Sequence, residues 1–514
     1  MIVLYHNQNK VISVTSQSGE VLAFDKKANI ASVIMNLAVK FPQSKIIWCN
    51  EKYKNFIDFE AIEKLFHHDK MMLSYNPNDE NFPGSKIGYI DETLFVKINK
   101  DVSYATWQMS SLIGVVHAGL LLAVHNKIKL DKDFDYYLCS IAKVCMPLGL
   151  LCYSEPKLLI KNNLTSTTKY SFFLLFKFVK QHYRKRWLFL LCLNLMIYEC
   201  RLPFLGLLKS LFYKNRNNNN IRLNNLQVSS SIKHDTDLST IDVIIPTIGR
   251  KNQLYDILKD LSKQSYLPKN IIIVEQNPIL DSVSELDYLV SEIWPFKIKH
   301  TFTHQPGACN ARNLALSQIE SEWIFFADDD IRVSNFFIAE AFVFLLKFRS
   351  KAASFSCLQK NENVTFKEIV QWSTFGSGCS IVKNEIVKNI RFDKGYEFAF
   401  GEDSDFGMQI RNQGMDVLYF PTPQILHLKA PMGGFRSKPN LEWGKDKIKP
   451  KPSPTVMLYK LIHQTVEQRK GYQIVLFFKY YSKQSIKNPI RYIFNFKKEW
   501  KQSLYWANKL IAKT

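Results

Sequence analysis

The fold of this 514-residue chain is decided by the stretch Glu322-Trp323-Ile324-Phe325-Phe326-Ala327-Asp328-Asp329-Asp330. A short apolar run that ends at polar residues is typical of a buried β-strand. The three carboxylates that follow repel one another, and the simplest counter-charge is a divalent cation, Mg²⁺ or Mn²⁺, bridged to a diphosphate. An aspartate-rich turn that caps the next helix is the alternative interpretation.

Strand and helix patterns alternate on the N-terminal side of this stretch. We expect strands over residues 242–246, 270–275 and 299–303, and helices over 253–262 and 310–318. This alternation is typical of a largely parallel sheet covered by helices. Polar clusters follow the predicted strands at their carboxyl ends, where ligands bind in open α/β sheets. We therefore expect a site at that edge of the sheet.

Two sets of motifs accompany the aspartate triplet. The first set ends with the triplet itself and occupies residues 244–250, 274–277, 305–313 and 328–330. The second set follows the triplet and occupies residues 375–380, 392–393, 401–405 and 427. In this order they resemble bacterial members of glycosyltransferase family 2. The resemblance covers roughly two fifths of the chain, and the ordered set is more specific than any single motif.

The resemblance implies a GT-A type, Rossmann-like α/β mixed sheet flanked by helices, and the pattern of the remaining chain predicts a smaller α/β module before it and amphipathic helices after it. The resemblance also implies a site for a nucleotide-diphosphate sugar. The implied contacts are the turn at Pro246, Thr247 and Arg250 over the nucleotide, Glu275 on the nucleobase, Arg312 on the nucleotide, Asp328 on the ribose, Asp329 in the same donor site and Asp330 on the metal. Glu275 departs from the commoner aspartate, which leaves the identity of the nucleobase open.

On the acceptor side, the resemblance makes Asp403 the general base. A hydroxyl nucleophile must lose its proton as it attacks the anomeric carbon, and one carboxylate opposite the leaving diphosphate can accept it. Because a single displacement needs one base, we expect inversion. Glu402 orients the acceptor or caps the helix, and Asp405 is equally well explained as a partner of the helix dipole.

Two downstream residues complete the expected site. His427 is a candidate metal ligand, although a lone histidine in an apolar strand is often a core residue with satisfied hydrogen bonds. Arg436 follows two glycines and suits a loop that closes over the leaving diphosphate, with a plain turn as the alternative.

The predicted function is inverting, metal-dependent sugar transfer, with Mn²⁺ or Mg²⁺, to a saccharide or lipid-linked acceptor in cell-surface polysaccharide or glycan assembly. Because the chain has no Q-x-x-R-W motif, we expect release of the product rather than extrusion of a polymer. The alternative is a catalytically inactive scaffold that binds membrane or a protein partner. Nucleic acid is not expected, since zinc spacing and helix-turn-helix or RNP-type signatures are missing.

The pattern along the chain predicts four regions: a degenerate glycosyltransferase-like module (1–165), basic amphipathic helices and an Asn-rich linker (166–240), the catalytic domain (241–440) and basic helices (441–514). Residues 44–52 align with residues 322–330, so the aspartate triplet becomes Asn50-Glu51-Lys52. In this module the position that corresponds to the expected general base, Asp403, falls near Tyr136. Chance similarity between apolar strands is the alternative.

Charge and cysteine usage predict the surroundings of the protein. A net charge of +22 favours polyanionic partners. The basic, aromatic-rich stretches at 170–213 and from residue 458 suit either an anionic membrane surface or internal packing. Nine scattered cysteines without a C-x-x-C pair indicate reduced thiols. Without a secretory signal or a spanning segment, we expect a cytoplasmic protein in peripheral contact with the inner face of the membrane.

Overall fold

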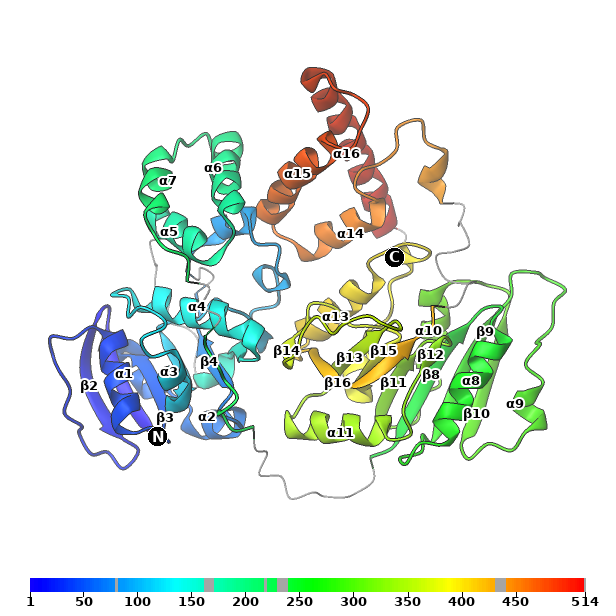
Figure 1. Cartoon of the computed structure of the whole chain (residues 1–514), viewed down its shortest axis with the longest axis horizontal. Coiled ribbons are helices and arrows are strands. Elements are labelled where there is room, and N and C mark those ends of the chain that lie inside the picture. Colours follow the sequence, from blue (N-terminus) through cyan, green and yellow to red (C-terminus); the bar gives the residue numbers. More distant parts are fainter. Residues whose placement is uncertain (79–81, 161–170, 217–219, 229–238, 430–440, 513–514) are drawn as a thin grey trace. The chain divides into compact units, whose positions relative to one another are not determined.

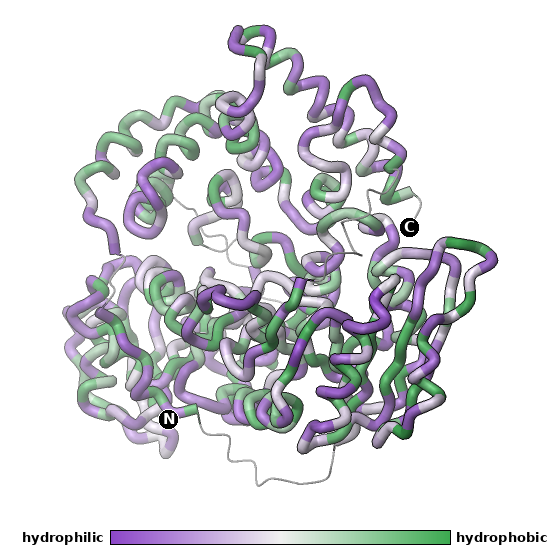
Figure 2. Tube along the Cα trace, turned by 45° about the vertical axis from the view of Figure 1, so that its right-hand side comes forward, coloured by the Kyte–Doolittle hydropathy of each residue, from purple (hydrophilic) through white to green (hydrophobic). Residues whose placement is uncertain are grey.

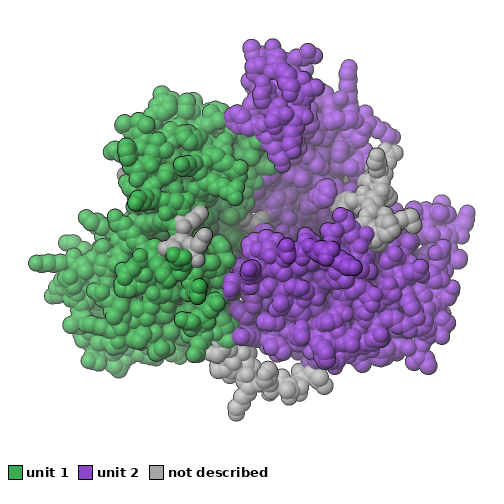
Figure 3. Space-filling view, viewed as in Figure 1, with its two compact units in different colours: residues 1–230, 465–476 green, residues 231–464, 477–514 purple. Residues whose placement is uncertain are grey.

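The structure is a computed structural model that describes residues 1–78, 82–160, 171–216, 220–228, 239–429 and 441–512. Internal contacts divide the chain into two compact units, shown in different colours in Figure 3. Unit 1 comprises residues 1–230 and 465–476, and unit 2 comprises residues 231–464 and 477–514. The domain boundaries expected at residues 165, 240 and 440 stay predictions.

Unit 2 is built on a mixed sheet with the strand order β10-β9-β8-β11-β15-β13-β16-β12, and β14 pairs with β16 (Figure 1). The four strands at one side run parallel to one another, and β15 runs antiparallel to both of its neighbours. The strands are β8 (Ile241–Thr247), β9 (Asn270–Gln276), β10 (Lys297–Thr303), β11 (Trp323–Ala327), β12 (Ile331–Arg332), β13 (Ala352–Leu358), β14 (Val370–Gln371), β15 (Cys379–Lys383) and β16 (Leu418–His427).

Helices cover this sheet because its central strands are apolar on both faces. All residues of β9 and β11 are buried. The helices and 3₁₀ turns are α8 (Lys251–Ser262), α9 (Tyr288–Ser291), α10 (Ala308–Leu316), α11 (Phe337–Lys347), α12 (Asn384–Val387), α13 (Glu402–Asn412), η6 (Lys394–Tyr396) and η8 (Glu442–Lys445). The strands and helices expected between residues 242 and 327 are confirmed, with ends within a few residues.

The C-terminal residues form three helices, as their pattern predicts: α14 (Pro454–His463), α15 (Val466–Tyr481) and α16 (Pro489–Ile511). Within unit 2, α14 packs against α16 and against α13. A buried hydrogen bond joins α14 to α13, because Nε2 of His463 lies 2.7 Å from Oδ1 of Asp405. The division between the two units falls inside α15.

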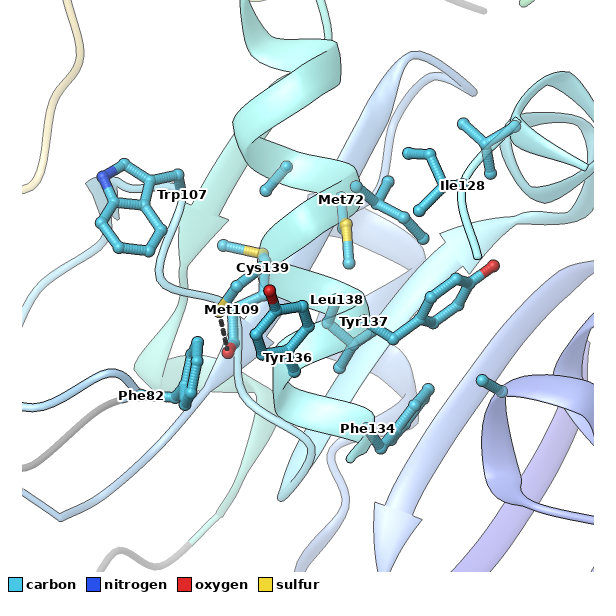
Figure 4. Close-up of a cluster of buried hydrophobic side chains, with 14 of the residues drawn as sticks. Met72, Phe82, Trp107, Met109, Ile128, Phe134, Tyr136, Tyr137, Leu138 and Cys139 are labelled. Atoms are coloured by element: carbon cyan, nitrogen blue, oxygen red, sulfur yellow. Dashed lines mark hydrogen bonds between the residues drawn. The ribbon is translucent and has the colours of Figure 1, made fainter. Parts of the chain in front are cut away.

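Unit 1 contains a second mixed sheet, with the order β2-β1-β3-β6-β4-β7-β5. Its strands are β1 (Ile2–Asn7), β2 (Lys10–Ser16), β3 (Lys45–Asn50), β4 (Met71–Tyr75), β5 (Tyr104–Ala105), β6 (Ile113–His117) and β7 (Leu151–Ser154). Its shorter elements are α1 (Ile30–Lys40), α2 (Phe59–Leu65), α3 (Ala118–Val124), α4 (Phe134–Cys145), η1 (Glu51–Phe56), η2 (Ser85–Tyr89), η3 (Leu94–Val96), η4 (Met146–Leu148) and η5 (Pro156–Leu158). Figure 4 shows Phe134 and Tyr136 of α4 in one apolar cluster with Met72 and Trp107.

The predicted fold class is confirmed. An α/β mixed sheet flanked by helices is preceded in the chain by a smaller α/β unit and followed by helices. The nine cysteines form no disulfide.

The two sheets share the order and sense of six strands. The series β1-β3-β6-β4-β7-β5 in unit 1 corresponds to β8-β11-β15-β13-β16-β14 in unit 2. In each series the first two strands are parallel, the third is antiparallel to the second and fourth, and the fifth is parallel to the fourth. They differ beside the first strand, where β1 is flanked by antiparallel β2 and β8 by parallel β9, and β16 also pairs with β12, which is outside the shared series.

The hydrogen-bond register also corresponds. The amide N–H of Asn50 donates to the carbonyl of Leu112, and the amide N–H of Asp328 donates to that of Gly378. One strand further on, the amide N–H of Ser110 donates to Oγ of Ser74, and the amide N–H of Gly376 donates to Oγ of Ser354, at 3.0 Å in both units. The structure therefore pairs Asn50 with Asp328, as the sequence alignment does.

Helices α5 (Phe172–His182), α6 (Lys185–Glu199) and α7 (Phe204–Leu211) belong to unit 1. Buried residues of α5 and α6, among them Phe176, Phe178 and Leu191, join the apolar cluster formed by α4 and the sheet. Across the described ranges, the structure contains no helix with the length and apolar character needed to span a bilayer.

Candidate active site

The carboxyl ends of three neighbouring strands bring the predicted donor-side residues to one edge of the sheet. Thr247 at the end of β8 lies opposite Glu275 at the end of β9, and half-buried Pro246 lies opposite Val274. β11, the other neighbour of β8, ends directly before Asp328. The edge predicted from the sequence is therefore the edge at which these side chains meet.

The second aspartate of the triplet points back under the β8 turn. Oδ2 of Asp329 accepts a hydrogen bond from Oγ1 of Thr247 (2.7 Å), and Oδ1 lies 2.5 Å from NH1 of Arg250. Burial raises the pKa of Asp329 to about 6, although Arg250 and Thr247 both act to lower it. Asp329 therefore anchors the turn that carries Arg250.

The third aspartate faces His427. Oδ1 of Asp330 lies 3.4 Å from Nε2 of His427, and Oδ2 lies 3.3 Å from NH1 of Arg250. The hydrogen bond with Asp330 raises the pKa of His427. No group of three or more His, Cys, Asp and Glu side chains in the described ranges is arranged to hold a metal ion. Asp330 and His427 supply an oxygen and a nitrogen donor, a pair that suits a divalent cation whose other ligands come from phosphate and water.

The first aspartate faces the other side of the site. Oδ1 of Asp328 lies 3.2 Å from NH2 of Arg312, a buried residue of α10. The carboxylate of Asp328 also lies directly over Gly378, where a Cβ atom would come within 2.1 Å of Oδ2. Burial acts to lower the pKa of Arg312, but Asp328, Asp403 and Glu402 raise it. Arg312 therefore stays charged among three carboxylates.

The predicted base, Asp403, lies in the first turn of α13. The amide N–H of Ser377 donates to its Oδ1 (3.3 Å). Desolvation raises the pKa of Asp403, and Arg312 and Ser377 offset part of that rise. A carboxylate with a raised pKa is a stronger base than an ordinary aspartate.

Glu402, the neighbour of Asp403, is also perturbed. Burial raises the pKa of Glu402 to about 7, and the charge of Asp403 adds to that rise. Both residues belong to the first turn of α13, where the helix dipole favours negative charge. Adjacent carboxyl groups whose pKa values are both raised by burial are typical of acid–base sites.

The two groups of carboxylates belong to one site. Electrostatic interactions link Cys357 to His427, Asp328 and Asp330, and they link Cys379 to Asp403 and Asp328. The two thiols also contact each other through a hydrogen bond. The structure therefore brings together residues from the triplet, from β16 and from α13, which lie far apart in the sequence.

Glu275 is held by neighbours of its own. Its carboxylate accepts hydrogen bonds from Oγ of Ser284 (2.6 Å) and from the amide N–H of Glu285 (3.3 Å), and lies 2.9 Å from Nε2 of His300. These contacts fix its orientation beside Thr247. Arg436, the remaining predicted residue, lies outside the described residues.

Sequence reasoning missed three residues that shape the site. Glu397 accepts hydrogen bonds from the amides of Cys309 (3.0 Å) and Asn310 (2.9 Å), so it caps the helix that carries Arg312. Ser377 holds Asp403, and His463 holds Asp405. The small-residue loop at 375–380 was a signal for Ser377, whereas no local pattern marks Glu397 or His463.

Residues 242–400 match the family model described as "Glycosyl transferase family 2". A comparison with curated protein sequences finds no match. The match covers the donor-side residues and the aspartate triplet, whereas the predicted site residues Glu402, Asp403, His427 and Arg436 follow it in the chain.

Among solved structures, TarS 1–349 from S. aureus is 20% identical with a TM-score of 0.31, over 37% of this chain and 60% of that one. The same protein in complex with UDP-GlcNAc is 18% identical with a TM-score of 0.32, over 46% of this chain and 70% of that one. GalNAc-T7 with UDP, GalNAc and Mn²⁺ is 14% identical with a TM-score of 0.31, over 38% of this chain and 44% of that one. The chain thus spans about 60% of the first of these proteins and less than half of the last.

Proposed function

We propose, because residues 242–400 belong to glycosyl transferase family 2, that the protein transfers a sugar from a nucleotide-diphosphate donor with inversion at the anomeric carbon. The acceptor is a saccharide or a lipid-linked saccharide, and the product enters a cell-surface polysaccharide or glycan. The observation that carries this proposal is the placement of Asp403 beside Arg312 and Asp328, with its carboxylate held by the amide of Ser377.

In this proposal Asp403 removes the proton of the attacking hydroxyl. Its raised pKa suits that role, because proton transfer is most effective when the pKa of the base is close to the working pH. Arg312 keeps enough positive charge nearby for Asp403 to be ionised. Glu402 binds the acceptor, and its own pKa of about 7 lets it donate or accept a hydrogen bond.

The donor lies over the β8 turn. Arg250 and Arg312 supply positive charge to the diphosphate, and Glu275 hydrogen-bonds the base in addition to its partner Ser284. Pro246, Thr247, Asp328 and Asp329 shape this side, and Arg436 is proposed to close over the leaving diphosphate. Preorganised charges of this kind stabilise the transition state without reorganisation during the reaction.

The proposed cofactor is Mn²⁺ or Mg²⁺, held by Asp330 and His427. Such a cation neutralises charge that develops on the leaving diphosphate. One contact favours a second candidate: Arg250 already neutralises Asp329 and Asp330. A protein that binds the donor without transferring the sugar could neutralise these two aspartates with Arg250 and would not need a cation.

Thermal denaturation with a panel of uridine, guanosine and thymidine diphosphate sugars, with and without Mn²⁺, tests the proposal. The true donor should raise the melting temperature by mass action, more so with the cation. Asp330→Ala should abolish both the cation effect and donor hydrolysis, while Asp287→Ala, at an exposed carboxylate in the same unit, should leave both intact. If a donor stabilises the protein but is neither hydrolysed nor transferred to any acceptor, the protein is instead a donor-binding protein without transfer activity.

We further propose that the sheet of unit 1 is a non-catalytic copy of the second half of the catalytic sheet. The shared strand order and the shared Ser74 and Ser354 hydrogen bonds support this. In the corresponding site, Asn50-Glu51-Lys52 replaces the aspartate triplet, so a cation has no carboxylate set to bind.

A further inference from the structure

Helix α7 of unit 1 has its small residues inside and its large apolar residues outside. The two buried residues of the helix are Gly206 and Ser210, one helical turn apart. The outer α7 surface, as we call it, consists of exposed apolar residues within and beside the helix: Leu202, Phe204, Leu205, Leu208, Leu211 and Phe212. Leu205 is 69% exposed and Phe212 is 88% exposed. A helix whose apolar face served the core would show the opposite pattern.

The inner face explains how α7 is held without its large side chains. Gly206 lies against the ring of Phe176 on α5, where a Cβ atom would come within 3.3 Å. The hydroxyl of Ser210 donates to the carbonyl of Leu207 (2.6 Å), so its hydrogen bond is satisfied inside the helix. Small residues at these two positions let α7 approach α5 closely. The six large side chains are therefore not needed for this packing.

Basic residues are frequent in the stretch of sequence that contains the outer α7 surface. Between residues 171 and 216 the chain has nine lysines and arginines and a single acidic residue, Glu199. Glu199 accepts hydrogen bonds from Lys86 (2.8 Å) and Tyr89 (2.5 Å), so its charge is already paired. Six of the basic residues are exposed: Arg184, Lys185, Arg186, Arg201, Lys209 and Lys214.

Figure 2 shows hydrophobic positions along α6 and α7, in the upper part of the view, interrupted by hydrophilic ones. Contiguous exposed apolar residues on a soluble surface mark an interaction site. A protein partner of ordinary composition matches the apolar residues but not so large an excess of positive charge. The mixture of large apolar side chains with lysine and arginine is typical of helices that lie in the interface of an anionic bilayer.

We infer that the outer α7 surface docks on an anionic lipid bilayer, with the exposed basic residues of α6 and α7 contacting lipid phosphates. This interaction is separate from sugar transfer, because its residues lie in unit 1 and the carboxylates of the candidate active site lie in unit 2. Docking brings the whole chain to a surface that carries lipid-linked molecules.

The test is co-sedimentation of the full chain with phosphatidylcholine vesicles, with and without phosphatidylglycerol. The wild-type protein should sediment with the phosphatidylglycerol vesicles, and added salt should weaken binding. Leu205→Glu combined with Leu208→Glu should lower the apparent affinity at least tenfold. Lys185→Glu combined with Arg186→Glu should lower it about tenfold, since each basic group near the surface adds to the attraction.

Val290→Glu combined with Ile293→Glu is the matched control, because both positions are highly exposed apolar residues in unit 2. This control should bind as the wild type does. Phe212→Ser is a second variant in case the double substitution fails to fold. No donor is present in the assay, so its outcome does not depend on the transfer reaction.

The inference would be overturned if the wild type, the Leu205→Glu and Leu208→Glu double variant and Phe212→Ser all bound the vesicles equally well. Equal binding of the wild type to neutral and anionic vesicles would also overturn it. Light scattering tests a second outcome. If the wild type is a dimer that does not bind vesicles, and if the Leu205→Glu and Leu208→Glu double variant is a monomer, the surface contacts a second copy of the chain and the inference is overturned.

Discussion

The two sheets of this protein carry nearly the same backbone and very different side chains at the same edge. Six strands agree in order, sense and register, down to a serine hydroxyl that accepts the same backbone hydrogen bond in each unit. At the edge, Asp328 corresponds to Asn50 and Gly378 corresponds to Leu112. Apolar strands and register therefore suffice for the fold, whereas the proposed chemistry depends on a few carboxylates and one glycine.

The correspondence extends to the start of α13, the helix that carries the proposed base. Oδ1 of Asp135 accepts a hydrogen bond from the amide of Ser111 (2.6 Å), as Asp403 does from Ser377. The sequence alignment placed this position near Tyr136, and the structure places it one residue earlier. Phe134 then corresponds to Glu402. Unit 1 thus has a carboxylate at the position of the proposed base but no acidic residue at the position of Glu402.

Two rings of unit 1 occupy positions that correspond to a proline and a carboxylate in unit 2. His6, at the position of Pro246, is buried, and its Nε2 lies 2.7 Å from the carbonyl of Ser111. Its ring packs edge-on against Phe134 at 6.1 Å. Burial raises the pKa of Asp135 to about 6.

The largest expected difference between the units is in catalysis. Asp403→Asn should lower kcat by about 10²–10⁴-fold, because the hydroxyl loses its proton acceptor. Asp135→Asn keeps the hydrogen bond from Ser111 and should leave kcat unchanged. Initial-rate kinetics on the two variants, with circular dichroism to verify folding, measure the difference. A comparable loss in folded Asp135→Asn would break the comparison, since unit 1 would then be catalytic.

A smaller effect is expected at the glycine under Asp328. Gly378→Ala places a Cβ atom 2.1 Å from the Asp328 carboxylate, so that carboxylate must move. Displacement of a positioning group by about 1 Å can cost roughly 10²-fold in rate, and we expect a loss of this order in kcat/KM for the donor. Leu112→Gly, the reverse change at the corresponding position, should leave kcat/KM as it is. Unchanged kinetics in Gly378→Ala would show that Asp328 does not touch the donor.

The next effect concerns stability and is expected in unit 1 alone. Gly114 corresponds to Ser380, but in unit 1 a Cβ atom there would lie 2.2 Å from the Trp48 ring and 2.5 Å from the carbonyl of Leu73. Gly114→Ser should destabilise unit 1 by about 3 kcal/mol through overpacking. Chemical denaturation would measure it, and Ser380→Gly is the reciprocal variant. Retained stability in Gly114→Ser would mean that the two cores accept the same residues.

The smallest expected effect is the dependence of stability on pH at Glu402. Its folded pKa of about 7 lies above the ordinary value of 4.5, so the folded state binds the proton more tightly. This contribution is fully present below pH 4.5 and is lost as pH rises through 7. Glu402→Gln should therefore stabilise unit 2 by about 1–2 kcal/mol at pH 8 and leave it unchanged at pH 4. A destabilised variant at pH 8 would show that the ionised carboxylate is needed for folding.

Local patterns allowed most of the unit 2 sheet to be predicted. The apolar runs that became β8, β9 and β11 are visible without neighbours, because each strand is buried along nearly its whole length. The two-residue strands β12 and β14 form only through pairing with β16 and leave no local pattern. Their existence could not be read from residues 331–332 or 370–371.

The site was predictable as a set of residue types but not as a set of partners. The triplet and the motif at 401–405 indicate carboxylates. Only the three-dimensional fold shows that Asp329 contacts Arg250 whereas Asp328 contacts Arg312. Glu397 caps α10 across a long stretch of sequence, which a single sequence cannot show.

The hydrogen bond between Asp405 and His463 has a consequence for dividing the protein into pieces. Both side chains are about 5% exposed, and His463 lies beyond the residues that match the family. A fragment ended at residue 440 would lack both this hydrogen-bond partner and the helix that packs against α13. The limits of the family match are therefore not the limits of an autonomously stable piece, and recombinant fragments should extend through α14 and the α16 helix that packs on it.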